Sequence, residues 1–165
     1  MKRLTSLTSA AKRGNADAQC QLAAILATGS GMPRDDAQAF HWYRQAANRD
    51  HPEATYNLAM MYWNGEGTRR SEARAQKLLE KAAKLGSVDA HEYLAELKLR
   101  TQPAAPDKAA LHLLHAIVAG SSRAAVLLAD WLHGERITKD AVTEGLRLLA
   151  KSKKSRNPQR VRRPK

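Results

Sequence analysis

The sequence predicts an all-α protein built from antiparallel helix hairpins. The 165-residue chain repeats itself at intervals of about 34–36 residues, the spacing of helical repeat proteins. Aromatic residues are only 5% of the chain, and alanine and leucine dominate its apolar residues. Such a composition favours close-packed helices over a β-sheet, which needs β-branched and aromatic residues.

The repeats become visible when the sequence is shifted by 36 residues, which places residues 14–49 on residues 50–85. A third copy covers residues 86–119, and a fourth, more divergent copy covers residues 120–152. The matching residue pairs are Ala18 and Ala54, Leu22 and Leu58, Ala23 and Ala59, Gly29 and Gly65, and Gly31 and Gly67. Residues 1–13 look like the second helix of a half repeat. We expect one solenoid over residues 1–152 with about nine helices.

Each copy has the pattern of two helices. In the second copy, apolar residues from Ala54 to Tyr62 recur at three-and-four spacing, which places them on one helix face. Ser71 is expected to begin the next helix, and Gly86 is expected to end it in a left-handed conformation.

Gly65 and Gly67 separate these two helices. Glycine adopts positive φ at little cost, so the pair suits a tight reversal. The alternative is a phosphate-binding loop, which should follow a strand and continue into a Gly-Lys-Ser/Thr sequence. Neither feature is present here, so the turn is the better interpretation.

The last two copies depart from this pattern. The third has Pro103 and Pro106 in place of the glycine pair, and Asp107 is a candidate cap for the following helix. The fourth has Gly145 inside its second helix, which indicates a loose terminal repeat.

The pattern A-x-x-x-L-A-x-x-x-x-x-G-x-G, followed by A-x-x-W-Y-R-Q-A-A, resembles the Sel1-like repeat, a relative of the tetratricopeptide repeat. Residues 18–47, with Trp42 and Tyr43, and residues 54–83 carry the match, whereas the later copies match only in their first helices. The resemblance implies a right-handed superhelix with a concave surface. It also implies a role as an adaptor in protein complexes, and no catalytic chemistry.

No set of residues predicts catalysis, a cofactor or a metal. His112 and His115 share a helix face, but we find no further ligands to complete a metal site, so a structural role is favoured. Cys20 lacks an obvious cationic neighbour and is expected to be a small packed residue. We therefore expect a protein that is not an enzyme.

A partner is expected on the first helices, by analogy with tetratricopeptide arrays. The residues that this analogy selects are Tyr56, Met60, Trp63, Asn64, Glu92, Glu96, Arg100 and Asp130, with Asp17, Cys20, Ala24, Val126 and His133 at matching positions. Trp63 suits an interface anchor, or it packs between adjacent hairpins. The two glutamates suit a basic segment, or they form a solvated helix face.

The net charge of +12 comes mainly from the C-terminus, and residues 153–165 are expected to be a disordered basic tail. The possible phosphate or acidic-partner contacts are Lys151, Lys153, Lys154, Arg156, Arg160, Arg162, Arg163 and Lys165. Three interpretations stay open: a solvated end, non-specific binding of nucleic acid, or docking on an acidic protein surface such as Glu92 and Glu96. No aromatic residue in the tail is available to stack on a base.

The cellular compartment is predicted to be the cytoplasm. A single cysteine suits a reducing environment, no window approaches a membrane span, and the N-terminus lacks an uninterrupted apolar signal segment. The leading hypothesis is a non-enzymatic scaffold that binds a peptide or protein. The alternative is a nucleic-acid-associated protein that uses its tail.

Overall fold

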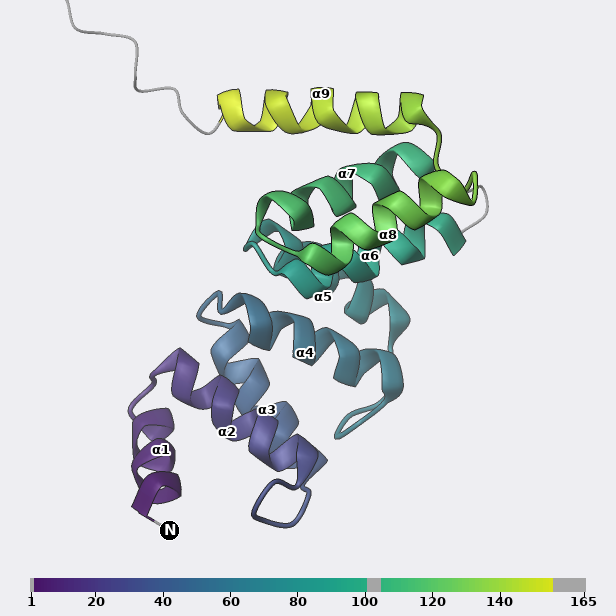
Figure 1. Ribbon diagram of the computed structural model, residues 1–165. Coiled ribbons are helices and arrows are strands. Elements are labelled where there is room, and N and C mark those ends of the chain that lie inside the picture. The colour runs from purple at the N-terminus through teal and green to yellow at the C-terminus, as the bar shows by residue number, and fades with distance from the viewer. Residues whose placement is uncertain (1, 101–104, 156–165) are drawn as a thin grey trace, which may run out of the picture. The chain divides into compact units, whose positions relative to one another are not determined.

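The structure is a computed structural model that describes residues 2–100 and 105–155. Within these residues it contains nine α-helices and no strand, as expected (Figure 1). The helices are α1 (Lys2–Lys12), α2 (Ala16–Thr28), α3 (Asp36–Ala47), α4 (Pro52–Asn64), α5 (Glu72–Lys84), α6 (Val88–Arg100), α7 (Pro106–Val118), α8 (Ser122–His133) and α9 (Lys139–Ser155). None of the helices in this part of the chain is long and apolar enough to cross a membrane.

The chain divides into two compact units, residues 1–90 and residues 91–165. In the first unit, α2 pairs with α3 and α4 pairs with α5, while α1 packs on α2 and α3 packs on α4. Small residues form the contacts, because Ala23, Ala39, Ala59 and Ala75 are all fully buried. Alanine stripes let neighbouring helices approach closely, so the repeat seen in the sequence is a repeat of helix-to-helix packing.

The helix ends follow from local sequence. Asn15 and Asp35 each accept a hydrogen bond from a backbone N–H in the first turn of the following helix, at 2.7 and 2.9 Å. Gly65 ends α4 with φ of 80°, in the left-handed conformation expected of it. Ser71 precedes α5, and Gly86 follows it with φ of 96°.

Gly67 has a second role besides its positive φ. A Cβ atom at this position would overlap the carbonyl oxygen of Asp36 and lie 3.1 Å from the backbone nitrogen of Ala37. The loop of the second hairpin therefore rests on the first turn of α3. Gly31, its counterpart in the first hairpin, has no neighbour within 4 Å of such an atom.

In the second unit, α9 does not form the regular hairpin with α8 that the repeat pattern predicts. It packs mainly along α7. Gly145 makes this contact possible, because a Cβ atom there would lie 3.0 Å from Leu114 Cδ1 and 3.3 Å from Leu111 N. The glycine that indicated a loose helix is thus a close-contact position, and α9 continues to Ser155, beyond the expected end at residue 152.

The start of α7 also differs from the sequence-based expectation. Asp107 was a candidate cap, but Ala105 occupies the N-cap position and makes no side-chain cap. Pro106 is the first helical residue, where its missing N–H costs nothing and its fixed φ suits the helix. Asp107 therefore lies in the first turn, where a negative charge favours the helix dipole.

Candidate functional site

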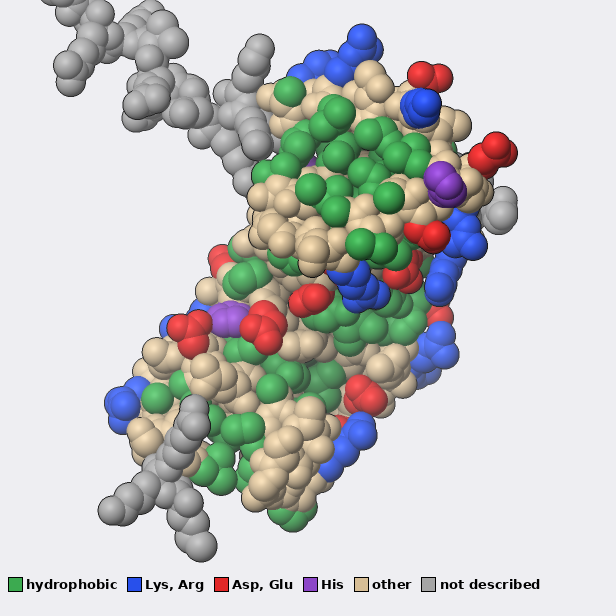
Figure 2. Space-filling view, viewed as in Figure 1, with side chains coloured by type: hydrophobic (Ala, Val, Ile, Leu, Met, Phe, Trp, Pro, Cys, Tyr) green, Lys and Arg blue, Asp and Glu red, His purple; other side chains and the backbone are tan. Residues whose placement is uncertain are grey.

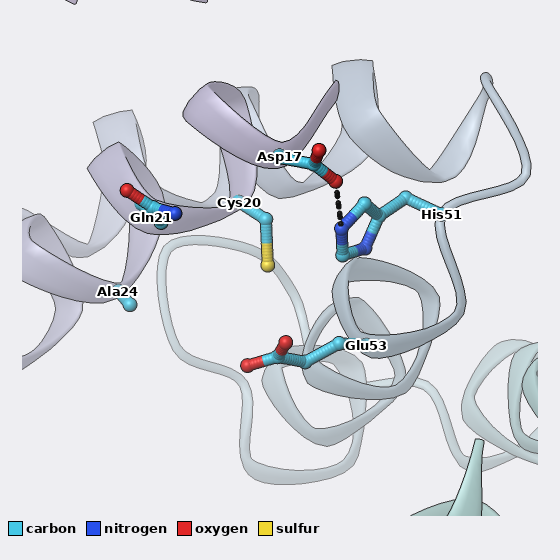
Figure 3. Close-up of a pocket in the computed structure, with 6 residues that line it drawn as sticks. All are labelled: Asp17, Cys20, Gln21, Ala24, His51 and Glu53. Atoms are coloured by element: carbon cyan, nitrogen blue, oxygen red, sulfur yellow. Dashed lines mark hydrogen bonds and ion pairs between the residues drawn. The ribbon is translucent and has the colours of Figure 1, made fainter. Parts of the chain in front are cut away.

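A pocket of about 280 Å³ opens in the first unit, on the first helices of its two hairpins (Figure 3). Four of its lining residues come from α2 and two from the start of α4. They are Asp17, Cys20, Gln21, Ala24, His51 and Glu53. Three of them, Asp17, Cys20 and Ala24, belong to the face that the sequence selected.

His51 and Asp17 join the two hairpins at the edge of this pocket. His51 Nδ1 accepts a hydrogen bond from the backbone nitrogen of Ala54 at 3.1 Å and so caps α4. The proton of the neutral ring therefore lies on Nε2, which donates to Asp17 Oδ1 at 3.1 Å, the dashed line in Figure 3. This contact leaves the second carboxylate oxygen of Asp17 directed away from the imidazole (Figure 3).

Cys20 lines the pocket without being a reactive thiol. Its side chain is only 3% exposed. Burial, with smaller contributions from the nearby carboxylates of Glu53 and Asp17, raises the pKa of its thiol to about 12. Because the thiolate is the nucleophile, Cys20 stays inert near neutral pH. This agrees with the packed role expected from the sequence.

A second pocket, of about 260 Å³, lies within the second unit between α6 and α8. Three residues predicted to face a partner, Glu96, Arg100 and Asp130, come together here. The remaining lining residues are Leu99, Leu127, Trp131 and Arg136. Glu96 and Arg100 form an ion pair at 3.7 Å, so charges of both signs lie next to the apolar lining residues of this pocket.

Glu92 does not take part in that surface. Glu92 as a residue is only 5% exposed, so the solvated helix face considered for it is wrong. Its carboxylate accepts a hydrogen bond from Ser121 Oγ at 2.5 Å and pairs with Arg123 at 3.2 Å. Glu92 therefore connects α6 to the start of α8, and a basic segment would have to displace these contacts.

The other predicted contact residues lie on α4, in the first unit. Tyr56, Met60 and Trp63 are half-buried, and Asn64 is exposed. None of the four lines the pocket shared by α2 and α4. Both interpretations of Trp63, as an anchor or as a packed residue, are compatible with this partial burial.

Three histidines gather in the second unit. His91 on α6 contacts His112 through their Nδ1 atoms, 3.0 Å apart, and its ring stacks on that of His115 at 4.9 Å. His91 is thus not the isolated residue that the sequence suggested. Burial, with smaller effects of His91, His115 and Lys98, lowers the pKa of His112 to about 4.

No metal site is found among the residues that the structure describes, because no group of three or more potential ligands has a suitable arrangement. The histidines instead fill space between helices, the role favoured for His112 and His115. Of the predicted basic contacts, Lys151 is exposed on α9, and Lys153 and Lys154 belong to the last turn of that helix. Arg156, Arg160, Arg162, Arg163 and Lys165 lie outside the described residues.

Sequence reasoning missed several pocket residues. His51 and Glu53 line the first pocket from the start of α4, and Leu127 and Trp131 line the second from α8. The repeat spacing could have identified Glu53, because it lies 36 residues after Asp17 and so occupies the equivalent position in the next repeat. Considering both helices that border each groove would have selected Glu53.

Taken together, the hairpins of the two units define a helical repeat protein. Comparison with known proteins specifies the class. The model of the Sel1 repeat family matches residues 16–51 and 52–87. Residues 16–87 are thus two Sel1 repeats, as the motif resemblance predicted. Sel1 repeat proteins generally act as protein-interaction scaffolds and are typically not enzymes.

Solved structures show the same fold. A Sel1 repeat protein from Oxalobacter formigenes superposes with a TM-score of 0.75 at 26% identity, over 94% of this chain and 45% of that one. The protective antigen c5321 of uropathogenic Escherichia coli gives 0.70 at 23% identity, over 93% and 33%. Cysteine-rich protein B of Helicobacter pylori gives 0.52 at 26% identity, over 54% and 67%. The chain thus spans less than half the length of the first two. Among curated proteins, none matches significantly.

Proposed function

We propose that this protein is a non-enzymatic scaffold that binds an extended segment of a partner protein along the first helices of its hairpins. The observation that carries this proposal is the recurrence of one kind of groove. In each unit, a pocket of similar volume lies on the first helices of successive hairpins, α2 with α4 and α6 with α8. These helices carry the face that related repeat arrays use for ligands.

The two grooves offer different chemistry to such a segment. In the first unit, Asp17 and Glu53 present carboxylates, which suit a basic or amide-rich stretch. In the second unit, Arg100 and Arg136 lie with Glu96 and Asp130 around Leu99 and Leu127, which suits an apolar side chain flanked by charges of both signs. A partner segment with these properties would match charge and polarity at each groove.

The test is affinity capture from the native cell with the wild type and two variants. Ala24→Arg places a long cationic side chain in the first groove, whereas Gln38→Arg makes a change of similar size at an exposed position of α3. The captured partner should be lost with Ala24→Arg and retained with Gln38→Arg. Retention with both variants would contradict groove binding.

Nuclease treatment during the same capture tests the alternative, nucleic-acid-associated function. Under the scaffold proposal the captured proteins persist after nuclease digestion and after removal of residues 156–165. Their disappearance in both cases would favour phosphate contacts by the basic tail, which would also weaken steeply with added salt.

We also propose a cytoplasmic location, which the buried free thiol of Cys20 supports because a reducing compartment keeps single cysteines reduced. Cell fractionation with an antibody to the native protein measures this directly.

A further inference from the structure

The first helix of the last hairpin, α8, exposes a face that the other first helices bury. Ala129 of α8 is equivalent to Ala23, Ala59 and Ala95, each of which is 0% exposed. Ala129 itself is exposed, and Val126, one turn earlier, is 68% exposed. Val126 is the most exposed large hydrophobic residue in the described part of the chain.

This face is open because two neighbours that α6 has are absent from α8. The counterpart of Ala125 on α6 is His91, which contacts His112 on α7, the second helix of its own hairpin. The counterpart of Val126 is Glu92, which contacts the start of the next first helix. On α8 neither position is covered, because α9 packs on α7 instead.

We define the α8 face as the exposed residues Ser122, Ala125, Val126, Ala129 and His133. They are three or four residues apart and so share one side of the helix, opposite the buried Ala124 and Trp131. Figure 2 shows hydrophobic side chains gathered on the visible side of the second unit, where α7 and α8 lie in Figure 1.

We propose that the α8 face pairs with the α8 face of a second copy of this chain, in antiparallel orientation about a twofold axis near Val126. In a twofold contact each copy uses the same patch, so the patch must be complementary to itself. The centre of the face meets this requirement, because valine and alanine side chains interdigitate and let two helices approach closely.

Charge order at the edge of the face selects the antiparallel orientation. Arg123 and Asp130 are both exposed and lie seven residues apart, on the same edge of α8. An antiparallel pair places Arg123 of one copy beside Asp130 of the other, and the twofold axis repeats this contact. A parallel twofold pair would place this edge on opposite sides of the two helices, so Arg123 and Asp130 of the two copies would not meet. Each α8 then covers the face that lacks its own hairpin partner.

One helix per copy forms a small interface, so the dimer is expected to be weak and concentration-dependent. Sedimentation velocity of the purified protein, from about 10 µM to about 1 mM, should show reversible conversion of monomer to dimer. A sedimentation coefficient that stays at the monomer value over this range would overturn the proposal. No partner protein is needed, so this result is independent of the proposed scaffold function.

Three matched variants localise the contact. Val126→Glu should remove dimerisation, whereas Val118→Glu on α7 and Leu146→Glu on α9 should leave it unchanged. Val118 and Leu146 are the other two exposed large hydrophobics of the described residues, at 57% and 50% exposure. All three side chains are at the surface, so circular dichroism should show native helix content in each variant. Loss of the dimer in either control, or its persistence in Val126→Glu, would contradict the assignment.

A cross-linking experiment tests whether the two copies meet through α8. Ala129→Cys, close to the twofold axis, should give a covalent dimer with a short bis-maleimide, and Ala150→Cys on the exposed side of α9 should not. The native Cys20 is buried and should stay unmodified, so the wild type serves as a blank. Asp130→Lys should also weaken the dimer, because the new lysine of one copy would lie beside Arg123 of the other copy and the two cations would repel. Equal cross-linking at both engineered positions would exclude the α8 contact.

Discussion

Gly67 shows how one missing side chain holds two hairpins together. Its backbone rests on the first turn of α3, at a distance that no Cβ atom tolerates. Gly31 occupies the same place in the first hairpin, also with positive φ, but with open space around it. The two glycines thus occupy equivalent positions in the repeat, but only Gly67 allows a close contact with a neighbouring helix.

We expect Gly67→Ala to lower the free energy of unfolding by about 3 kcal/mol or more, because backbone must move as well as adopt a strained φ. Gly31→Ala should cost only about 1–2 kcal/mol, the cost of a left-handed conformation for alanine. Urea unfolding followed by circular dichroism measures both values. Equal losses would show that the contact with α3 contributes nothing.

Glu92 and Glu96 lie one helical turn apart and differ in burial. Glu92 is enclosed by Ser121 and Arg123, whereas the Glu96 side chain is 33% exposed and its ion pairs are long. Glu92→Ala should therefore destabilise the second unit by about 1–3 kcal/mol, since a charge-assisted hydrogen bond is lost. Glu96→Ala should cost no more than about 1 kcal/mol, as for exposed ion pairs. The urea midpoints of the two variants measure the difference, and a larger loss for Glu96→Ala would contradict this assignment.

At the level of helices, α9 is the element that departs most from the repeat. Gly145 takes the close-contact position against Leu111 and Leu114 of α7. The buried side of α9 also includes Ala141 and Leu149, each one turn from this glycine. These residues align α9 along α7 and leave α8 without a hairpin partner.

Gly145→Leu should detach α9 from α7, because the side chain cannot fit where even a Cβ atom is close to the α7 backbone. We expect a loss of about 2 kcal/mol or more. Ala150→Leu, at an exposed position of the same helix, should stay within about 0.5 kcal/mol of the wild type. Hydrogen exchange of the α9 amides distinguishes the two, and intact protection in Gly145→Leu would show that the glycine contact is dispensable.

For the whole molecule, the two units are expected to respond differently to acid. The histidine cluster belongs to the second unit, and the pKa of His112 is lowered there to about 4, chiefly by burial. An unfolded histidine takes up its proton near pH 6.5, whereas folded His112 does so only near pH 4. The part of the stability that depends on a neutral His112 is therefore fully present above pH 6.5, and it is lost as the pH falls towards 4.

Hydrogen exchange, corrected for the intrinsic effect of pH, should show α6 and α7 losing protection between pH 7 and pH 5 before α2 and α3 do. His112 can change the free energy of unfolding by no more than about 1.4 kcal/mol per pH unit, the slope that one proton gives. His112→Gln should flatten this slope between pH 6.5 and 5. An unchanged slope in the variant would mean that other groups cause the acid sensitivity.

The sequence alone was enough to predict the helices, their hairpin repeat and the class of protein. These features depend on local information: three-and-four spacing of Ala and Leu, a capping residue such as Asp35, and glycine at left-handed helix ends such as Gly29 and Gly65. The expectation of a packed thiol at Cys20, which depended on the lack of a cationic neighbour in the sequence, was also correct, because Cys20 is buried.

Only the tertiary structure showed which residues meet. Glu92 looked like an accessible acid and is buried by Ser121 and Arg123, and His91 looked isolated and contacts two other histidines. The same limit applies to α9, whose repeat position predicted pairing with α8 while Gly145 allows closer packing on α7. Periodicity determines which face of a helix is apolar, but the helix that covers that face is chosen by the shape and distance of competing neighbours.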